Sequence, residues 1–185
     1  KDDFRYFRNW YEVDFQIEDW RPTVKTESYG YYMADISQVL NYGNGLRELE
    51  ANIIQKYPYL NGDANWVLHR DSSYFEEGLT FSARQRRFSP KPVPKGCSFT
   101  HTGLMIFADK DDLDWLPVYL GSGLVRSILG LLAPPRKIEM GYVGNIPLPK
   151  FRDENTISIL KSVQHGRMIS SMQFAMKDET SRYFS

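Results

Sequence analysis

The stretch from Phe81 to Lys95 contains cations but no carboxylate. Its cations are Arg84, Arg86, Arg87, Lys91 and Lys95. Arginine makes paired hydrogen bonds to phosphates and to guanine edges, whereas lysine acts as a point charge that suits phosphates. The stretch therefore predicts contacts to an anionic partner. We expect the three arginines to read base edges or hold phosphates closely, and the two lysines to bind phosphates only.

Polar and stiff residues are interleaved with these cations. Secondary contacts to phosphates or base edges are expected from Thr80, Ser82, Gln85 and Ser89. Pro90, Pro92 and Pro94 impose an extended path, so the loop has less entropy to lose on binding. A weaker second contact surface is expected between Arg21 and Gly30, at Lys25 and Tyr29. The competing interpretation is that the charge run is only a solvated face.

Other patterns in the chain are better explained by structure than by chemistry. Gly121 and Gly123 are spaced as in a cofactor-binding glycine loop, but the preceding residues suggest a helix where such a loop needs a strand. The carboxylates between Asp109 and Asp114 fail the spacing of a calcium loop and suit helix capping. His69, His101 and His165 lack the spacing of a metal pair. We therefore predict no catalytic, cofactor-binding or metal site in this chain.

The bulk composition is that of a neutral globular chain. It has 185 residues, with 23 Lys plus Arg balanced by 23 Asp plus Glu, and is 42% hydrophobic. Neutrality argues against a protein that coats nucleic acid non-specifically. The electrostatic field that a ligand meets, however, depends on how the charges are distributed. The single Cys97 suggests a buried thiol and a reducing, cytoplasmic location. The sequence has no apolar run of about 18 residues, so we expect no membrane partner.

Periodicity and breaker residues indicate how these side chains are positioned. Leu46, Leu49, Ile53 and Ile54 predict a helix that Pro58 ends. A strand is expected within residues 30–42, and a loop ends at Arg21–Pro22. Short strands are expected at "WVLHR", "GLTFSA", "CSFTH" and "LMIFA".

The second half of the chain is expected to be mainly helical. Residues 109–135 predict two short helices, with Asp111 or Asp112 capping the first, Gly121 ending it and Ser122 capping the second. Residues 138–151 suggest a strand and an exit loop. A final amphipathic helix begins near Asp153, with a possible break at Gly166. The fold class is therefore α+β, with mixed, mostly antiparallel short strands, flanking helices and a C-terminal amphipathic helix.

Several motifs in this order resemble the target-recognition region of large adenine-specific DNA methyltransferases, of the phage-defence (BREX) type and of type IIG restriction–modification enzymes. The first motif residues are Tyr74, Phe75, Gly78, Leu79, Thr80 and Phe81; Pro94, Gly96 and Phe99 follow, then Gly103 and Phe107. "DLDWLPVYLGSGLVRSIL" resembles the helix pair of that family, with Gly121 where Asn is usual. "YVGNIPLPKF" and "DETSRYF" resemble its exit strand and closing element. The resemblance runs from about Lys25 to the last residue.

The resemblance implies a sequence-specific reader of double-stranded DNA that lies against the major groove. The chain departs from the family in lacking the catalytic "NPPY" tetrad, because "APPR" at 133–136 has neither its Asn nor its aromatic residue. A catalytic domain upstream of Lys1 would then methylate adenine with S-adenosylmethionine. Residues 1–150 would form the recognition domain, with 1–22 as the connection to the catalytic domain, and 151–185 would form a helical segment. Thr80, Phe81 and Pro94–Gly96 would be shared scaffold, whereas Ser82–Lys91 falls where that family varies.

Two other interpretations stay open at this stage. The basic loop could meet an acidic protein partner, with the aromatic N-terminal segment docked on a sister domain. The chain could instead be an enzyme with an unrecognised site, although no constellation of acid, base and nucleophile is present in the sequence.

Overall fold

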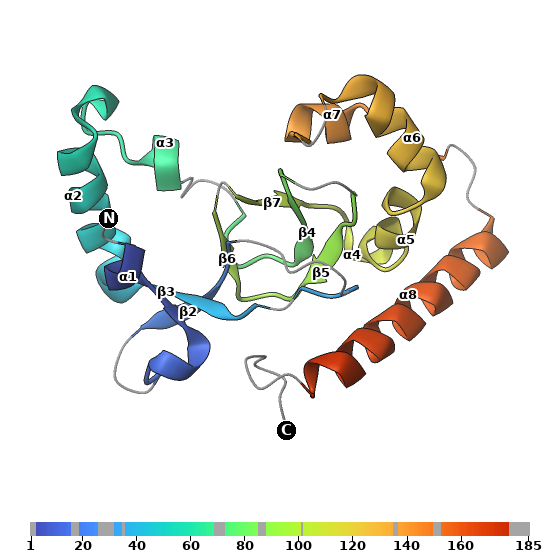
Figure 1. Ribbon diagram of the computed structural model, residues 1–185, viewed down its shortest axis with the longest axis horizontal. Coiled ribbons are helices and arrows are strands. Elements are labelled where there is room, and N and C mark those ends of the chain that lie inside the picture. The colour runs from blue at the N-terminus through green and yellow to red at the C-terminus, as the bar shows by residue number, and fades with distance from the viewer. Residues whose placement is uncertain are drawn as a thin grey trace.

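The computed structural model describes residues 3–15, 19–25, 32–34, 36–68, 73–84, 88–100, 102–134, 137–149 and 153–177. Two small sheets lie at the centre of the molecule, with α1–α3 toward one end and the later helices toward the other (Figure 1). The expected α+β class is confirmed. The closing element "DETSRYF" and the residues Tyr29, Gln85, Arg86 and Arg87 lie outside the described residues.

The first sheet has the strand order β1-β3-β2-β6. Its strands are β1 (Phe7–Asn9), β3 (Gln38–Asn41), β2 (Trp20–Val24) and β6 (Ser98–Phe99), and the short α1 (Asp3–Tyr6) and η1 (Trp10–Glu12) flank β1. The β2–β6 pair is parallel, and the other pairs are antiparallel. The expected loop end at Arg21–Pro22 is wrong, because both residues lie within β2, where Pro22 stands opposite Val39. Residues expected as a connection thus contribute strands, and the proposed domain division stays a prediction.

The second sheet carries the hairpin that contains the basic stretch. Its order is β5-β4-β7, with both pairs antiparallel. The strands are β4 (Gly78–Ser82), β5 (Lys91–Val93) and β7 (Gly103–Ile106). The strands expected at "GLTFSA" and "LMIFA" form in this sheet at or near the expected residues, and the strand expected at "CSFTH" forms as β6 in the first sheet.

A helical lobe follows the first sheet. It contains η2 (Gly43–Leu46), α2 (Arg47–Lys56), η3 (Pro58–Leu60) and α3 (Asn65–Leu68). The predicted helix before Pro58 is confirmed as α2. The strand expected at "WVLHR" is wrong, because its described residues are helical in α3. Leu68 and Ala64 pack against Ile53 and Leu60, so this local core favours a helical turn.

Three helices, where two were expected, cover the second sheet. They are α4 (Lys110–Leu113), α5 (Leu116–Leu120) and α6 (Gly123–Leu132). Asp109, rather than Asp111 or Asp112, occupies the N-cap of α4. Gly121 ends α5, and the Ser122 hydroxyl accepts a hydrogen bond from the Val125 amide at 3.3 Å, as expected of a cap.

The expected strand within 138–151 is also wrong. Residues Met140–Gly144 form the helix α7 instead. Its Val143 and the following Ile146 are buried in the main core, together with Phe81, Phe88 and Trp115. This core lies between the second sheet and α5–α7, and the burial of Val143 explains why a helical turn replaces an extended chain.

The last helix, α8 (Glu154–Ala175), runs along the side of the helical end (Figure 1). Asp153 caps it as predicted, and it continues through Gly166 without a break. Ile157 and Leu160 pack on the main core. The expected apolar stripe is only partly inward, because Met172 and Met176 are substantially exposed. Of the helices in the described part of the chain, none combines the length and apolarity needed to cross a membrane.

Candidate nucleic-acid interface

The β4–β5 hairpin determines which basic residues reach the surface. Gly78, Leu79 and Thr80 stand opposite Val93, Pro92 and Lys91 in the antiparallel ladder. On its other edge, β4 pairs with β7, so β4 is the central strand of the sheet. The chain between Ser82 and Lys91 therefore forms the connection of the hairpin. The structure describes both ends of this connection but not residues 85–87.

Both ends of the hairpin connection are fixed to the core. The rings of Phe81 and Phe88 meet edge to face, with centroids 5.1 Å apart and planes at 72°. Both side chains are almost fully buried. Close to the first end, the Ile138 amide donates a hydrogen bond to the Ala83 carbonyl at 2.9 Å. The described residues at the two ends of the connection are therefore anchored in the core.

The exposed candidates lie on and near this connection. Arg84 is exposed and Ser82 is half-buried, and the Ser82 hydroxyl accepts a hydrogen bond from the Arg84 amide at 3.3 Å. Ser89 is half-buried. Lys95 is exposed in the turn after β5, where Gly96 adopts a φ of +94° that favours glycine. Arg84, Ser82 and Lys95 are thus available to a partner.

Two candidates from the sequence are not at the surface. Thr80 is fully buried, and its hydroxyl donates to the Leu104 carbonyl at 3.1 Å. Lys91 is only 3% exposed and opens β5, opposite Thr80. The charge pattern had placed both residues on a solvated stretch. Thr80 instead lies among the first four residues of β4, which are all buried, and Lys91 opens β5, a strand that was not expected. Neither side chain can meet a partner in this structure.

The expected second surface is described only at Lys25. This side chain is half-buried, and its ammonium lies 4.3 Å from the centre of the Phe7 ring. The Lys25 carbonyl accepts a hydrogen bond from the Thr102 hydroxyl. Lys25 is therefore held against the first sheet by its backbone and by its charge.

The structure adds Lys137, which the sequence reading did not select. Its ammonium contacts the Glu139 carboxylate at 2.7 Å, and both side chains are more than half exposed. The hydrogen bond and charge of Glu139 raise the pKa of Lys137 above its usual value, while the nearby Arg84 acts in the opposite direction. The Arg136–Lys137 pair after two prolines was the available sequence signal, but nothing in it indicated proximity to Arg84.

The motif residues that carry the family resemblance pack together as scaffold. Tyr74 meets Phe99 edge to face at 4.8 Å, and Phe99 lies 5.9 Å from Phe107, measured between ring centroids. The Phe75 amide donates to the Cys97 carbonyl at 3.0 Å, and the Gly96 amide donates to the Phe75 carbonyl at 2.8 Å. These motifs are distant in sequence, but their contacts join the segment before β4 to the turn after β5. They therefore stabilise the base of the hairpin.

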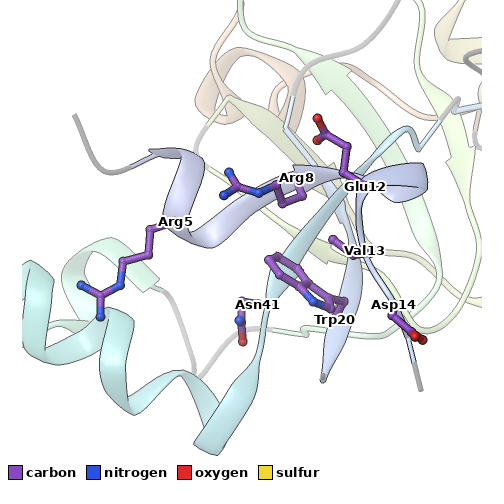
Figure 2. Close-up of a pocket in the computed structure, with 7 residues that line it drawn as sticks. All are labelled: Arg5, Arg8, Glu12, Val13, Asp14, Trp20 and Asn41. Carbon is purple, nitrogen blue, oxygen red and sulfur yellow. The ribbon is translucent and has the colours of Figure 1, made fainter. Parts of the chain in front are cut away.

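A cavity of about 380 Å³ on the first sheet is a competing site. It is lined by Arg5, Arg8, Glu12, Val13, Asp14, Trp20 and Asn41 (Figure 2). The charged groups do not converge on one point: Arg5 extends toward α2, where it pairs with Glu48, and Asp14 points away from Trp20. The Glu12 carboxylate accepts a hydrogen bond from the Asn9 amide at 2.7 Å. Arg5 and Glu12 are therefore engaged in contacts that hold the N-terminal segment.

Within the ranges that the structure describes, no group of three or more His, Cys, Asp or Glu side chains could hold a metal ion. In the cluster at 109–114, the Asp112 carboxylate instead accepts a hydrogen bond from the Trp115 indole at 3.0 Å. This carboxylate therefore serves the packing of the helical end.

No protein-family model matches the chain. The chain is 28% identical over 173 residues to the adenine-specific methyltransferase PglX of Lacticaseibacillus casei (strain Zhang). The match covers 85% of this chain but 14% of the methyltransferase. The chain thus spans about one seventh of the length of that relative and is a distant homologue of one region of it.

Proposed function

We propose that this chain is the domain that reads the DNA target sequence of an adenine-specific methyltransferase. The observation that carries the proposal is the β4–β5 hairpin, which exposes Arg84 next to a base fixed by Phe81, Phe88 and Ile138. The distant homology to a region of an adenine-specific methyltransferase supports DNA as the ligand of this hairpin. A neutral protein that presents local cations from a rigid base suits recognition of an anionic duplex.

The proposed contacts follow from exposure and chemistry. Arg84, with Arg86 and Arg87 further along the same connection, would read guanine edges in the major groove or hold phosphates closely. Lys95 would bind a phosphate. Secondary contacts would come from Ser82, Gln85 and Ser89, and a second surface from Lys25 and Tyr29. We leave Thr80 and Lys91 out of the contact set because both are buried.

The catalytic step belongs to another region in this proposal. A methyltransferase domain of the same longer protein would bind S-adenosylmethionine and transfer its methyl group to the exocyclic amine of adenine. This chain would supply no atom to that reaction. Its role would be to select the duplex sequence, as in restriction–modification and phage-defence methyltransferases of the family it resembles.

The test is selection of duplexes by the purified chain from a random library, followed by sequencing. We expect one enriched motif, and affinity that falls steeply between about 50 and 200 mM salt. The triple variant Arg84→Gln, Arg86→Gln, Arg87→Gln should lose the motif and keep its thermal unfolding temperature, because each well-placed arginine contributes about 1–3 kcal/mol of discrimination. The control, Arg47→Gln with Lys56→Gln, removes exposed cations from α2 in the separate helical lobe and should keep the motif.

Two outcomes would overturn the proposal. A folded chain that binds no duplex, or a triple variant that selects the wild-type motif, would exclude sequence reading by this connection. The alternative is a protein-interaction module with a basic loop. In that case polyglutamate would compete with any duplex sequence equally well, and no motif would be enriched.

A further inference from the structure

We propose that Lys137 forms the second half of the anion-contact surface, paired with Arg84, and that Glu139 holds Lys137 until a DNA phosphate replaces the carboxylate. The inference rests on the proposed DNA-reading function and extends it to a segment far from the hairpin in sequence. It assigns Lys137 as a phosphate-binding residue and Glu139 as an internal competitor of the phosphate.

The backbone places the two cations side by side. The Ile138 amide donates to the Ala83 carbonyl at 2.9 Å, and the next residues along the two segments, Lys137 and Arg84, lie close enough for their charges to interact. Ile138 is buried in the same core cluster as Phe81 and Phe88. The two segments are therefore fixed by one hydrogen bond and by shared packing, and both cations stand at the surface beside that junction.

The segment that carries Lys137 is itself constrained. The Lys137 amide donates to the Pro134 carbonyl at 3.2 Å, which holds Lys137 close to the end of α6. Glu139 begins α7, where its carbonyl accepts hydrogen bonds from the amides of Tyr142 and Val143. The backbone of Lys137 is therefore restrained by its own hydrogen bond and by the start of α7 two residues later, and less of its entropy remains to be lost on binding.

The charges explain why Lys137 would exchange the Glu139 carboxylate for a phosphate. Arg84 disfavours the charged form of Lys137, and Glu139 more than offsets this effect, so the pKa of Lys137 is raised. The Lys137–Glu139 pair is exposed, at 63% and 53% of the two side chains, and exposed ion pairs contribute little net stability. A phosphate that approaches both cations gains attraction to each of them, whereas among the described residues the ion-pair partner of the Glu139 carboxylate is Lys137.

Opposite effects of two variants distinguish this exchange from an ordinary structural ion pair. If Glu139 competes with phosphate, removing its charge strengthens binding and removing Lys137 weakens it. If the pair only supports the fold, either change breaks the same contact and both variants shift in the same direction. Glu139→Gln is a mild change, because within the described residues the Glu139 side chain makes no capping hydrogen bond to α7.

The experiment measures duplex affinity of the whole chain by fluorescence anisotropy between about 50 and 200 mM salt. Lys137→Gln should weaken binding about threefold or more and reduce the slope of log K against log salt by about 0.9, as expected for one lost phosphate contact. Glu139→Gln should tighten binding by a similar factor. Glu48→Gln is the matched control, because Glu48 on α2 pairs with Arg5 at comparable exposure and belongs to neither proposed contact surface.

The outcomes separate this inference from the function on which it rests. If Arg84→Gln weakens binding while Lys137→Gln and Glu139→Gln change neither affinity nor salt slope, the inference is wrong and the DNA-reading function stands. A change of duplex affinity in the same direction for Lys137→Gln and Glu139→Gln also rejects the inference. If Arg84→Gln too has no effect, or the chain binds no duplex, the proposed function itself fails.

Discussion

Phe81 and Phe88 clamp the two ends of the hairpin connection together, with ring centroids 5.1 Å apart and planes at 72°. Phe81 is the last but one residue of β4, and Phe88 follows residues 84–87 in the sequence. Both rings are buried in the main core, against the helices α5–α7. The basic part of the connection is thus bounded in the sequence by two side chains that belong to the core.

Replacing Phe88 should destabilise the fold strongly. Phe88 is 2% exposed, and truncating a buried phenylalanine to alanine costs about 3–5 kcal/mol of unfolding free energy. We expect Phe88→Ala to lose that amount in urea denaturation, and Phe88→Leu to lose clearly less. Phe174→Ala is the control, because Phe174 is 66% exposed and should change the unfolding free energy by less than about 0.5 kcal/mol. Similar losses at the two positions would contradict the clamp.

The fold was predictable from sequence where one periodic signal dominates. Leu46, Leu49 and Ile53 at helical spacing before Pro58 located α2 closely. Trp66–Leu68 and Met140–Gly144 were expected as strands and are helical. A short apolar run fits either conformation by period, and here burial of Leu68 and Val143 in local packing decides. That packing depends on partners that are distant in sequence.

The candidate site, like the fold, was predictable only where a local pattern determines the outcome. The charge pattern identified Arg84 and Lys95, which are exposed, but it also included Thr80 and Lys91, which the ladder buries. Strand register determines which face a side chain takes, and charge spacing does not reveal register. Lys137 was missed because its position beside Arg84 depends on the long-range Ile138–Ala83 hydrogen bond.

Two glycine substitutions should shift stability in opposite directions. A Cβ at Gly103 would lie 2.7 Å from the Val24 carbonyl oxygen, so Gly103→Ala must displace backbone and should cost about 1–3 kcal/mol of unfolding free energy. A Cβ at Gly130 would meet no described atom within 4 Å, and Gly130 is exposed within α6. Gly130→Ala should therefore stabilise the protein by about 0.5–1 kcal/mol. Urea denaturation checks both, and stabilisation by Gly103→Ala would refute the tight packing of β7 against β2.

The cap of α8 should make stability depend on pH. The Asp153 carboxylate accepts hydrogen bonds from the Thr156 hydroxyl and amide, which lower its pKa from the usual 3.8. A lowered folded-state pKa gives stability that is present above pH 3.8 and lost as the pH falls through the folded-state value. Asp153→Asn keeps a capping side chain without the charge, so its Tm should lie below wild type at pH 7 and converge with it in strong acid.

Thermal unfolding followed by circular dichroism checks this dependence. Asp109→Asn is the control, because among the described residues the Asp109 side chain makes no capping hydrogen bond in α4. A Tm difference for Asp153→Asn that is the same at both pH values would show that the charge of Asp153 is not what stabilises α8.

Thr80 and Ser82 should separate folding from DNA reading, although they lie two residues apart on β4. The buried Thr80 hydroxyl donates to the Leu104 carbonyl at 3.1 Å, so Thr80→Val should cost about 0.5–1.5 kcal/mol of unfolding free energy and leave the selected motif unchanged. The half-buried Ser82 hydroxyl holds the Arg84 amide at 3.3 Å. Ser82→Ala should change stability by less than about 0.5 kcal/mol. It should instead weaken discrimination between the selected duplex and a scrambled one, because Arg84 is then less constrained.

Urea denaturation measures the change in stability, and competition binding measures the change in discrimination. A loss of discrimination in Thr80→Val with none in Ser82→Ala would reverse the assignment of which residue is scaffold.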